Sequence, residues 1–152
     1  MKRLSRRVVL TGLVGTTALC VTAYAIAGDS ETLTPQQAFA AAGTGDILLV
    51  DIRRPDEWQS TGIAQYAVPI DMRRADFATA VLAARRSPTQ PIALICARGV
   101  RSARMTARLT DAGVTPIIDI PEGMLGSFAG PGWVKRGLPV VEWDTDSQED
   151  TT

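Results

Sequence analysis

Short, mostly apolar runs that alternate with helical segments constrain the fold of this chain more than any other feature. The runs are 47–50, 92–95 and 114–118, and the helical segments are 35–42, 75–86 and 102–112. Apolar runs of this length without a polar alternation are typical of strands that are buried on both faces. Strands that alternate with helices in this way predict an α/β fold with a parallel sheet.

Local signals mark the ends of several elements. Thr34 and Gln37 have the spacing of a capping box, with Pro35 at the first helical position, and we expect this helix to end near Gly43. Shorter elements are expected as a helical turn at 55–58, a brief strand at 67–68 and a short helix at 124–128. A solvated, disordered tail is predicted for residues 142–152.

The distribution of charge excludes one large class of function. The chain has 152 residues, which suits one domain with appendages, and its formal net charge is zero. Residues 1–27 contain Lys2, Arg3, Arg6 and Arg7 and no acid, so acids outnumber bases in the rest of the chain. Because binding to phosphates requires a basic face, we expect no nucleic-acid partner.

The N-terminus has the pattern of an export signal. A basic start precedes an apolar run that ends near Ala25 and Ala27, either of which offers a cleavage site. The run Ser5-Arg6-Arg7-Val8-Val9-Leu10 resembles a twin-arginine signal, which predicts a bacterial, periplasmic or otherwise exported protein. The alternative is an uncleaved membrane anchor, the only case in which we expect a membrane contact. A lipoprotein signal at Cys20 is disfavoured because Leu19 precedes it.

Removal of residues 1–27 would leave Cys96 as the single cysteine of the chain, and the chain contains no histidine. A lone thiol cannot form an internal disulfide, even in an oxidising compartment. Without histidine there is no histidine-based metal site, no Cys-His pair and no histidine general base. We therefore expect no metal and no cofactor, and any activation of Cys96 must come from its own loop.

The segment that follows Cys96 contains what such activation needs. Cys96 ends the strand 92–95, at the edge of a parallel sheet where ligands bind. A thiolate has to be stabilised, because a free cysteine has a pKa of about 8.5. Gly99 permits a loop that directs its N–H groups at the sulfur, Arg98 and Arg101 add positive charge, and Ser102 is expected to cap the next helix.

This segment resembles the active-site loop of the rhodanese (sulfurtransferase) family, in which a cysteine is followed by four residues, an arginine and a helix. The loop is Cys96-Ala97-Arg98-Gly99-Val100-Arg101-Ser102. Two further segments resemble the family, namely Leu49-Val50-Asp51-Ile52-Arg53-Arg54-Pro55-Asp56-Glu57-Trp58 and Gly123 to Gly132-Trp133, closing on Gly137-Leu138-Pro139-Val140. The resemblance covers roughly 32–141 and implies a three-layer fold with a central, mostly parallel sheet flanked by helices.

The resemblance also implies roles for individual residues. Cys96 would be the nucleophile that carries sulfur as a persulfide, and residues 97–102 would stabilise it. Asp51 and Arg53 are expected to brace loops, and the spacing of Arg53 and Glu57 permits an ion pair one helical turn apart. Trp58 and Trp133 are interpreted as core or lid aromatics.

Three functions remain open from the sequence. The first is a sulfurtransferase that takes sulfur from a small donor such as thiosulfate and passes it to a thiophilic acceptor, which could be another protein. The second is a non-catalytic persulfide carrier. The third is a phosphatase or arsenate reductase, which is disfavoured because four residues rather than five separate Cys96 from Arg101, and because no general acid is evident. Thr61 and Val100 depart from the family pattern, which leaves the substrate open.

Overall fold

The computed structural model describes residues 31–144. Its elements are β1 (Glu31–Thr32), α1 (Pro35–Thr44), β2 (Leu48–Asp51), α2 (Pro55–Thr61), β3 (Ile63–Ala64), β4 (Val68–Pro69), α3 (Phe77–Ala83), β5 (Ile92–Ile95), α4 (Val100–Asp111), β6 (Ile117–Asp119), α5 (Gly132–Lys135) and β7 (Val140–Val141). The predicted export segment 1–27 and the end of the predicted tail, 145–152, lie outside the described residues. Between residues 31 and 144, no helix is long and apolar enough to cross a membrane.

The central sheet has five strands in the order β1-β6-β5-β2-β4, and all of its strand pairs are parallel. Every residue of β2, β5 and β6 is buried. This burial explains why these strands are almost continuously apolar, since both of their faces are covered by other elements. The prediction of a parallel α/β sheet is therefore confirmed.

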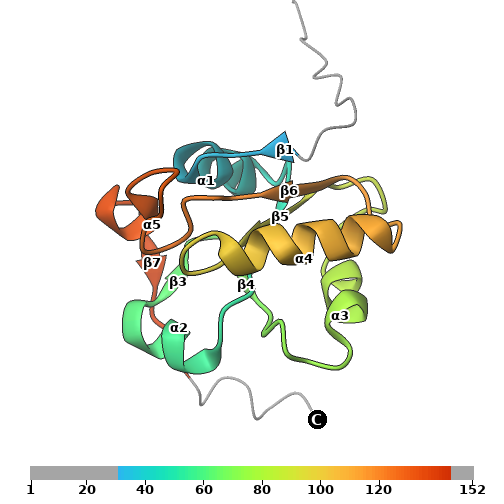
Figure 1. Cartoon of the computed structure of the whole chain (residues 1–152), viewed down its shortest axis with the longest axis horizontal. Helices are drawn as coiled ribbons and strands as arrows, with labels where there is room; N and C mark the ends of the chain where they lie inside the picture. The colour runs from blue at the N-terminus through green and yellow to red at the C-terminus, as the bar shows by residue number, and fades with distance from the viewer. Residues whose placement is uncertain (1–30, 145–152) are drawn as a thin grey trace, which may run out of the picture.

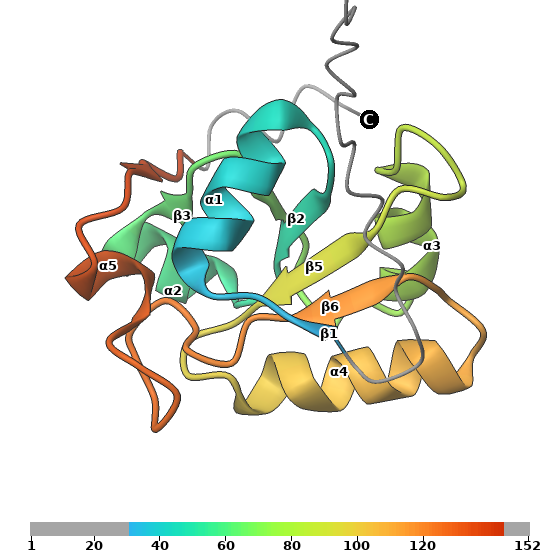
Figure 2. The same cartoon turned by 90° about the horizontal axis from the view of Figure 1, so that it is seen from above.

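Helices cover both faces of this sheet and make the fold three-layered (Figure 1 and Figure 2). Along β2, Leu48 and Val50 point to one face and Leu49 to the other, as the alternation of a strand requires. The first face packs against α3 and α4 through residues that include Phe77 and Met105. The second face packs against α1 and α5, and it includes the fully buried Trp133.

The predicted capping box is present at the start of α1. The Gln37 N–H donates to Thr34 Oγ1 at 3.3 Å, and the Thr34 N–H donates to Gln37 Oε1 at 2.9 Å. The helix continues to Thr44, slightly past the predicted end, because the left-handed turn that stops it is at Gly45, where φ is 80°.

Helix α3 is shorter than the predicted 75–86, and α4 begins two residues before the predicted 102. Two other elements differ from the sequence prediction because their backbone amides bind elsewhere. The third core strand begins at Ile117 rather than at Val114, since the Val114 N–H donates to the Leu109 carbonyl and closes the end of α4. No helix forms at 124–128, because the N–H groups of Met124 and Leu125 donate to the carbonyls of residues 96 and 97. The segment expected to be a helix instead binds the loop that follows β5 through backbone hydrogen bonds.

The C-terminal part of the described chain returns to the domain. Strand β7 pairs with β3 in a small antiparallel sheet. Beyond it, the Trp143 ring lies against the Trp58 ring with 4.8 Å between centroids, and Trp58 is only 3% exposed. Trp143 therefore belongs to the folded domain, and the prediction of a solvated tail is wrong for this residue. The expected role of Trp58 as a core aromatic agrees with its burial.

Candidate active site

Cys96 lies immediately after β5, at the carboxyl edge of the parallel sheet, and it is 1% exposed. It is the only free cysteine among residues 31–144. The neighbouring strands β2 and β6 end at the same edge, with Asp51 and Asp119 as their last residues. The sheet thus places one thiol and two carboxyl groups at the edge where α/β proteins bind ligands.

Ser102 is the residue that contacts the sulfur most directly. Its N–H donates to Cys96 Sγ at 3.4 Å, and Cys96 Sγ lies 3.5 Å from Ser102 Oγ. Ser102 Oγ also donates to the Gly99 carbonyl at 3.0 Å. The expectation that Ser102 caps α4 is wrong, because the helix begins at Val100 and its N-cap is Gly99. Ser102 instead directs a first-turn amide of this helix at the sulfur, where the helix dipole favours negative charge.

Gly99 sets the course of the loop between the strand and α4. Its φ is 80°, and a Cβ at this position would overlap the Pro121 carbonyl oxygen. Both observations require glycine, the first because of backbone conformation and the second because of space. Ala97 is buried beneath the loop, whereas Val100 is 58% exposed.

Arg101 pairs with Glu57 across 44 positions of the chain. Arg101 Nη1 donates to Glu57 Oε2 at 2.7 Å, and Nη2 donates to Oε1, so the contact is bidentate. The hydrogen bonds from Arg101 lower the pKa of Glu57 to about 2 against the opposing effect of burial. Conversely, the pKa of Arg101 is raised, chiefly by Glu57 and to a lesser extent by Cys96. Arg101 therefore lies near the sulfur with most of its charge already compensated.

The predicted ion pair between Arg53 and Glu57 is wrong, because the Glu57 carboxylate is bound by Arg101. Arg53 reaches only the Glu57 carbonyl oxygen, at 3.3 Å. Its ion pair is with Asp51, at 2.7 Å, and the two side chains are 1% and 0% exposed. Arg53 also donates to Thr61 Oγ1 and to the Gly62 carbonyl, each at 2.7 Å. The pair thus fastens the C-terminal end of α2 to the edge of the sheet.

Asp119 is a site residue that the sequence analysis did not single out. It ends β6 beside Cys96 and is 6% exposed, and its Oδ1 has no hydrogen-bond partner within the described residues. Burial raises the pKa of Asp119, and a hydrogen bond with the Ser102 side chain opposes this rise. The sequence did contain a signal for Asp119, because this residue directly follows an apolar run that was predicted to be a strand. The ends of parallel strands meet at one edge of a sheet, so a carboxyl group at such an end lies near Cys96.

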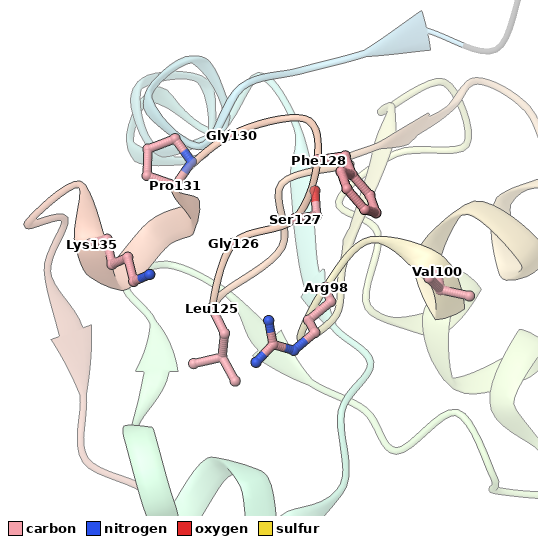
Figure 3. A pocket seen from close by; sticks show the side chains of 9 residues that line it. All are labelled: Arg98, Val100, Leu125, Gly126, Ser127, Phe128, Gly130, Pro131 and Lys135. Carbon is pink, nitrogen blue, oxygen red and sulfur yellow. The ribbon is translucent and has the colours of Figure 1, made fainter.

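A groove beside the loop of residues 96–102 is the second feature that the sequence did not reveal. It has a volume of about 580 Å³ and is lined by Arg98, Val100, Leu125, Gly126, Ser127, Phe128, Gly130, Pro131 and Lys135. Figure 3 shows Arg98 extending from the loop after β5 toward Leu125 on the facing segment. The glycines between residues 123 and 132 were the only sequence signal that this segment forms one side of the groove.

The fold and the site together define a class: a three-layer α/β protein in which a buried cysteine follows a central strand and is enclosed by the loop into the next helix. Such a site can form a covalent intermediate on sulfur without metal or histidine. The chain belongs to the rhodanese-like domain family, whose model matches residues 34–126.

Individual relatives agree with this assignment. A sulfurtransferase of Allochromatium vinosum is 28% identical over 113 residues, covering 74% of this chain and 92% of the relative. The polysulfide-sulfur transferase homodimer of Wolinella succinogenes has the same fold, with a TM-score of 0.58, 22% identity and coverage of 78% of this chain and 83% of that chain. A protein of Rhodopseudomonas palustris of unknown function, named a possible tyrosine phosphatase, has a TM-score of 0.55 and 26% identity, covering 73% and 84% of the two chains.

Proposed function

We propose that this protein is a sulfurtransferase that carries sulfur as a persulfide on Cys96. One observation carries the proposal: the Cys96 sulfur sits at the end of β5 with the Ser102 N–H donated to it at 3.4 Å. A helix N-terminal amide directed at sulfur stabilises a thiolate or a persulfide anion. The sulfurtransferases among its relatives support the same chemistry.

The proposed donor is a thiosulfate-like anion. The Cys96 thiolate attacks the outer sulfur, the sulfur–sulfur bond of the donor breaks, and sulfite leaves with the bonding electron pair. The product is a persulfide on Cys96. An acceptor nucleophile then attacks the outer sulfur of that persulfide and releases the Cys96 thiolate, which completes a covalent two-step cycle. We propose that the Ser102 amide, which donates to Cys96 Sγ at 3.4 Å, and the Arg98 side chain of the same loop stabilise the anions in both steps.

A phosphatase is the weaker alternative, although one structural relative is named as a possible one. A phosphate in the loop would need a free guanidinium to bind its oxygens. The Arg101 guanidinium is instead held by both oxygens of Glu57. The short spacing from Cys96 to Arg101 argues in the same direction.

Intact-mass measurement after treatment with thiosulfate tests the proposal. We expect the wild-type chain to gain the mass of one sulfur atom and Cys96→Ser to gain none. In the full-length chain, which still contains Cys20, Cys20→Ser is the matched control and is expected to gain the sulfur like the wild type. A sulfur adduct retained in Cys96→Ser would sink the proposal. Turnover with thiosulfate and cyanide, measured as thiocyanate released, then separates an enzyme from a non-catalytic carrier, which would show a stable persulfide and negligible turnover.

We also propose that the protein is exported, on the basis of the basic and apolar segment 1–27. N-terminal sequencing of the protein recovered from cells that produce it is the test. A new N-terminus after Ala25 or Ala27 is expected, and an intact N-terminus in the membrane fraction would indicate the anchor instead.

A further inference from the structure

Asp119 is a buried carboxyl group that the proposed reaction cycle does not use. It ends β6 beside β5, where it is aligned with Leu94. Ile117 of the same strand lies in the core shared with α4, whereas Ile118 lies in the core on the opposite face. Because side chains alternate along a strand, Asp119 points with Ile117 toward α4, which runs alongside β6 (Figure 2). Cys96 lies on the same face of the sheet.

Asp119 has no ion-pair partner among the described residues. It is 6% exposed, and its Oδ1 has no hydrogen-bond partner within this part of the chain. The same is true of Thr106 Oγ1, on the buried face of α4. A buried carboxylate without a cation costs free energy, so this environment favours the neutral acid and raises the pKa of Asp119.

The other ionisable groups on the elements around Asp119 point elsewhere or are already paired. On β1, Glu31 is aligned with Ile118 and so belongs to the opposite face of the sheet. The charged residues of α4, of the loop before it and of the segment after β6 are exposed or bound by another residue, namely Arg98, Arg101, Arg104, Arg108, Asp111 and Glu122. Among the described residues, Cys96 is therefore the ionisable group that faces the same side as Asp119.

Ser102 connects these two groups through one hydroxyl. Its Oγ lies 3.5 Å from Cys96 Sγ, and its side chain also forms a hydrogen bond with Asp119. A hydroxyl donates one hydrogen bond but can accept two. When Asp119 is ionised, the hydroxyl proton can bind the carboxylate while the Cys96 thiol donates to Oγ. When the sulfur is ionised, a protonated Asp119 can donate to Oγ while the hydroxyl proton binds the sulfur.

We propose that Asp119 is a positioning residue that shares one negative charge with Cys96 through the Ser102 hydroxyl. The inference rests on the proposed role of Cys96 as the reactive thiol and names the group that takes its proton. As the charge moves to sulfur, the Cys96 S–H bond breaks and its electron pair stays on the sulfur. The proton passes to Ser102 Oγ, and the former hydroxyl proton of Ser102 passes to the Asp119 carboxylate. No external base is required, and the resting thiol stays largely protonated, which slows its oxidation.

The ionisation of Cys96 in an Asp119→Asn variant tests the proposal. In the Cys20→Ser background, the fraction of thiolate is followed against pH by ultraviolet absorbance, with Cys96→Ser as the blank. The neutral amide does not compete for the charge, so we expect the midpoint to fall by about one pH unit or more, the size of coupling between interacting sites. An unchanged or raised midpoint in the folded variant would overturn the proposal.

Two further variants separate this charge sharing from other effects. Asp111→Asn is the matched control, because Asp111 is exposed at the end of α4 and its loss changes the net charge equally. We expect it to leave the midpoint unchanged, and a fall as large as that of Asp119→Asn would contradict a local effect. In a Ser102→Ala background, Asp119→Asn is expected to shift the midpoint less. Equal shifts in the two backgrounds would refute the route through the hydroxyl.

A measurement on the wild-type chain keeps the test independent of the folding of any variant. The carbon-13 shift of the Asp119 carboxyl group is followed against pH before and after treatment with thiosulfate. A persulfide anion on Cys96 is expected to raise the pKa of Asp119 by about one unit or more, and an unchanged value would refute the shared charge. The absorbance titration needs no sulfur transfer. A lowered midpoint in a chain that forms no persulfide would therefore refute the proposed function alone.

Discussion

Gly99 shows at the scale of one residue how the chain builds a reactive sulfur without histidine. Its left-handed conformation starts α4 directly beneath the loop, so that the Ser102 amide points at Cys96 Sγ. Because glycine has no Cβ, the Pro121 carbonyl can also approach the loop closely. The site thus depends on a residue that makes no contact with substrate through a side chain.

Substitution of Gly99 by alanine is expected to disrupt this loop. The left-handed conformation costs an alanine about 1–2 kcal/mol, and the overlap with the Pro121 carbonyl adds roughly 1–3 kcal/mol. Gly113→Ala is the matched control, since Gly113 has a similar φ of 83° but no atom within 4 Å of the added Cβ. Urea denaturation should therefore show a clearly larger loss of stability for Gly99→Ala. Equal losses for the two variants would mean that the Pro121 contact does not constrain the loop.

At the scale of whole elements, two ion pairs hold the short helix α2 against the rest of the site. Arg53 fastens the end of α2 to the sheet through Asp51, Thr61 and Gly62. Glu57 fastens its first turn to the first turn of α4 through Arg101. The loop of residues 96–102 and the turn after β2 are therefore mechanically linked, although they are distant in the sequence.

The Glu57–Arg101 pair predicts a loss of stability in acid. Because the pKa of Glu57 falls from 4.5 to about 2 on folding, its stabilisation is fully present above pH 4.5 and disappears as the pH falls toward 2. Glu57→Gln is expected to cost about 1 kcal/mol at pH 7, a value that allows for screening by solvent. The difference between wild type and variant should vanish near pH 2 in chemical denaturation experiments.

A matched control for this prediction is Asp76→Asn. Asp76 pairs with Arg74 at 2.8 Å, but both side chains are more than half exposed, so we expect almost no change in stability at either pH. A double-mutant cycle with Arg101→Gln isolates the Glu57 contact. A coupling energy near zero in that cycle would contradict the link between α2 and α4.

The whole molecule is a parallel sheet with an apolar core on each face, closed at one end by the C-terminal strand. Cys96 belongs to the core shared with α3 and α4, whereas the segment that carries the groove packs into the core shared with α1 and α5. The sulfur and the segment that lines the groove are thus supported by different faces of the sheet. Strand β7 pairs with β3, and the Trp143 ring packs against Trp58 of α2.

Removal of the Trp143 ring tests whether the packing of Trp143 against Trp58 contributes to the stability of the domain. Trp143→Ala is expected to lower the free energy of unfolding by about 1–2 kcal/mol, because an aromatic pair is lost and Trp58 becomes exposed. Thermal denaturation followed by tryptophan fluorescence measures the loss. Glu142→Ala changes an exposed neighbour and should have no effect. A Tm unchanged by Trp143→Ala would show that the contact between Trp143 and Trp58 does not stabilise the domain.

Much of the fold and the centre of the site follow from local sequence patterns. The apolar runs at 47–50 and 92–95 predict strands buried on both faces, and the alternation with helices predicts that the strands are parallel. Cys96 at the end of one such run was therefore expected at the binding edge, and Gly99 predicted a tight loop. These properties depend on residues close together in the chain, which is why periodicity and composition reveal them.

What only the tertiary structure decided is how distant segments meet around that cysteine. Sequence spacing paired Glu57 with Arg53, but the orientation of α2 brings its carboxylate to Arg101 instead. The segment 124–128 was expected to be helical, yet its amides bind the carbonyls of residues 96 and 97, and it lines the groove together with the loop that follows β5. Such contacts depend on the directions in which loops leave the sheet, and no local pattern encodes these directions. The sequence by itself determined the sheet and its cysteine, whereas the folded chain decided which charges the cysteine faces and what can bind beside it.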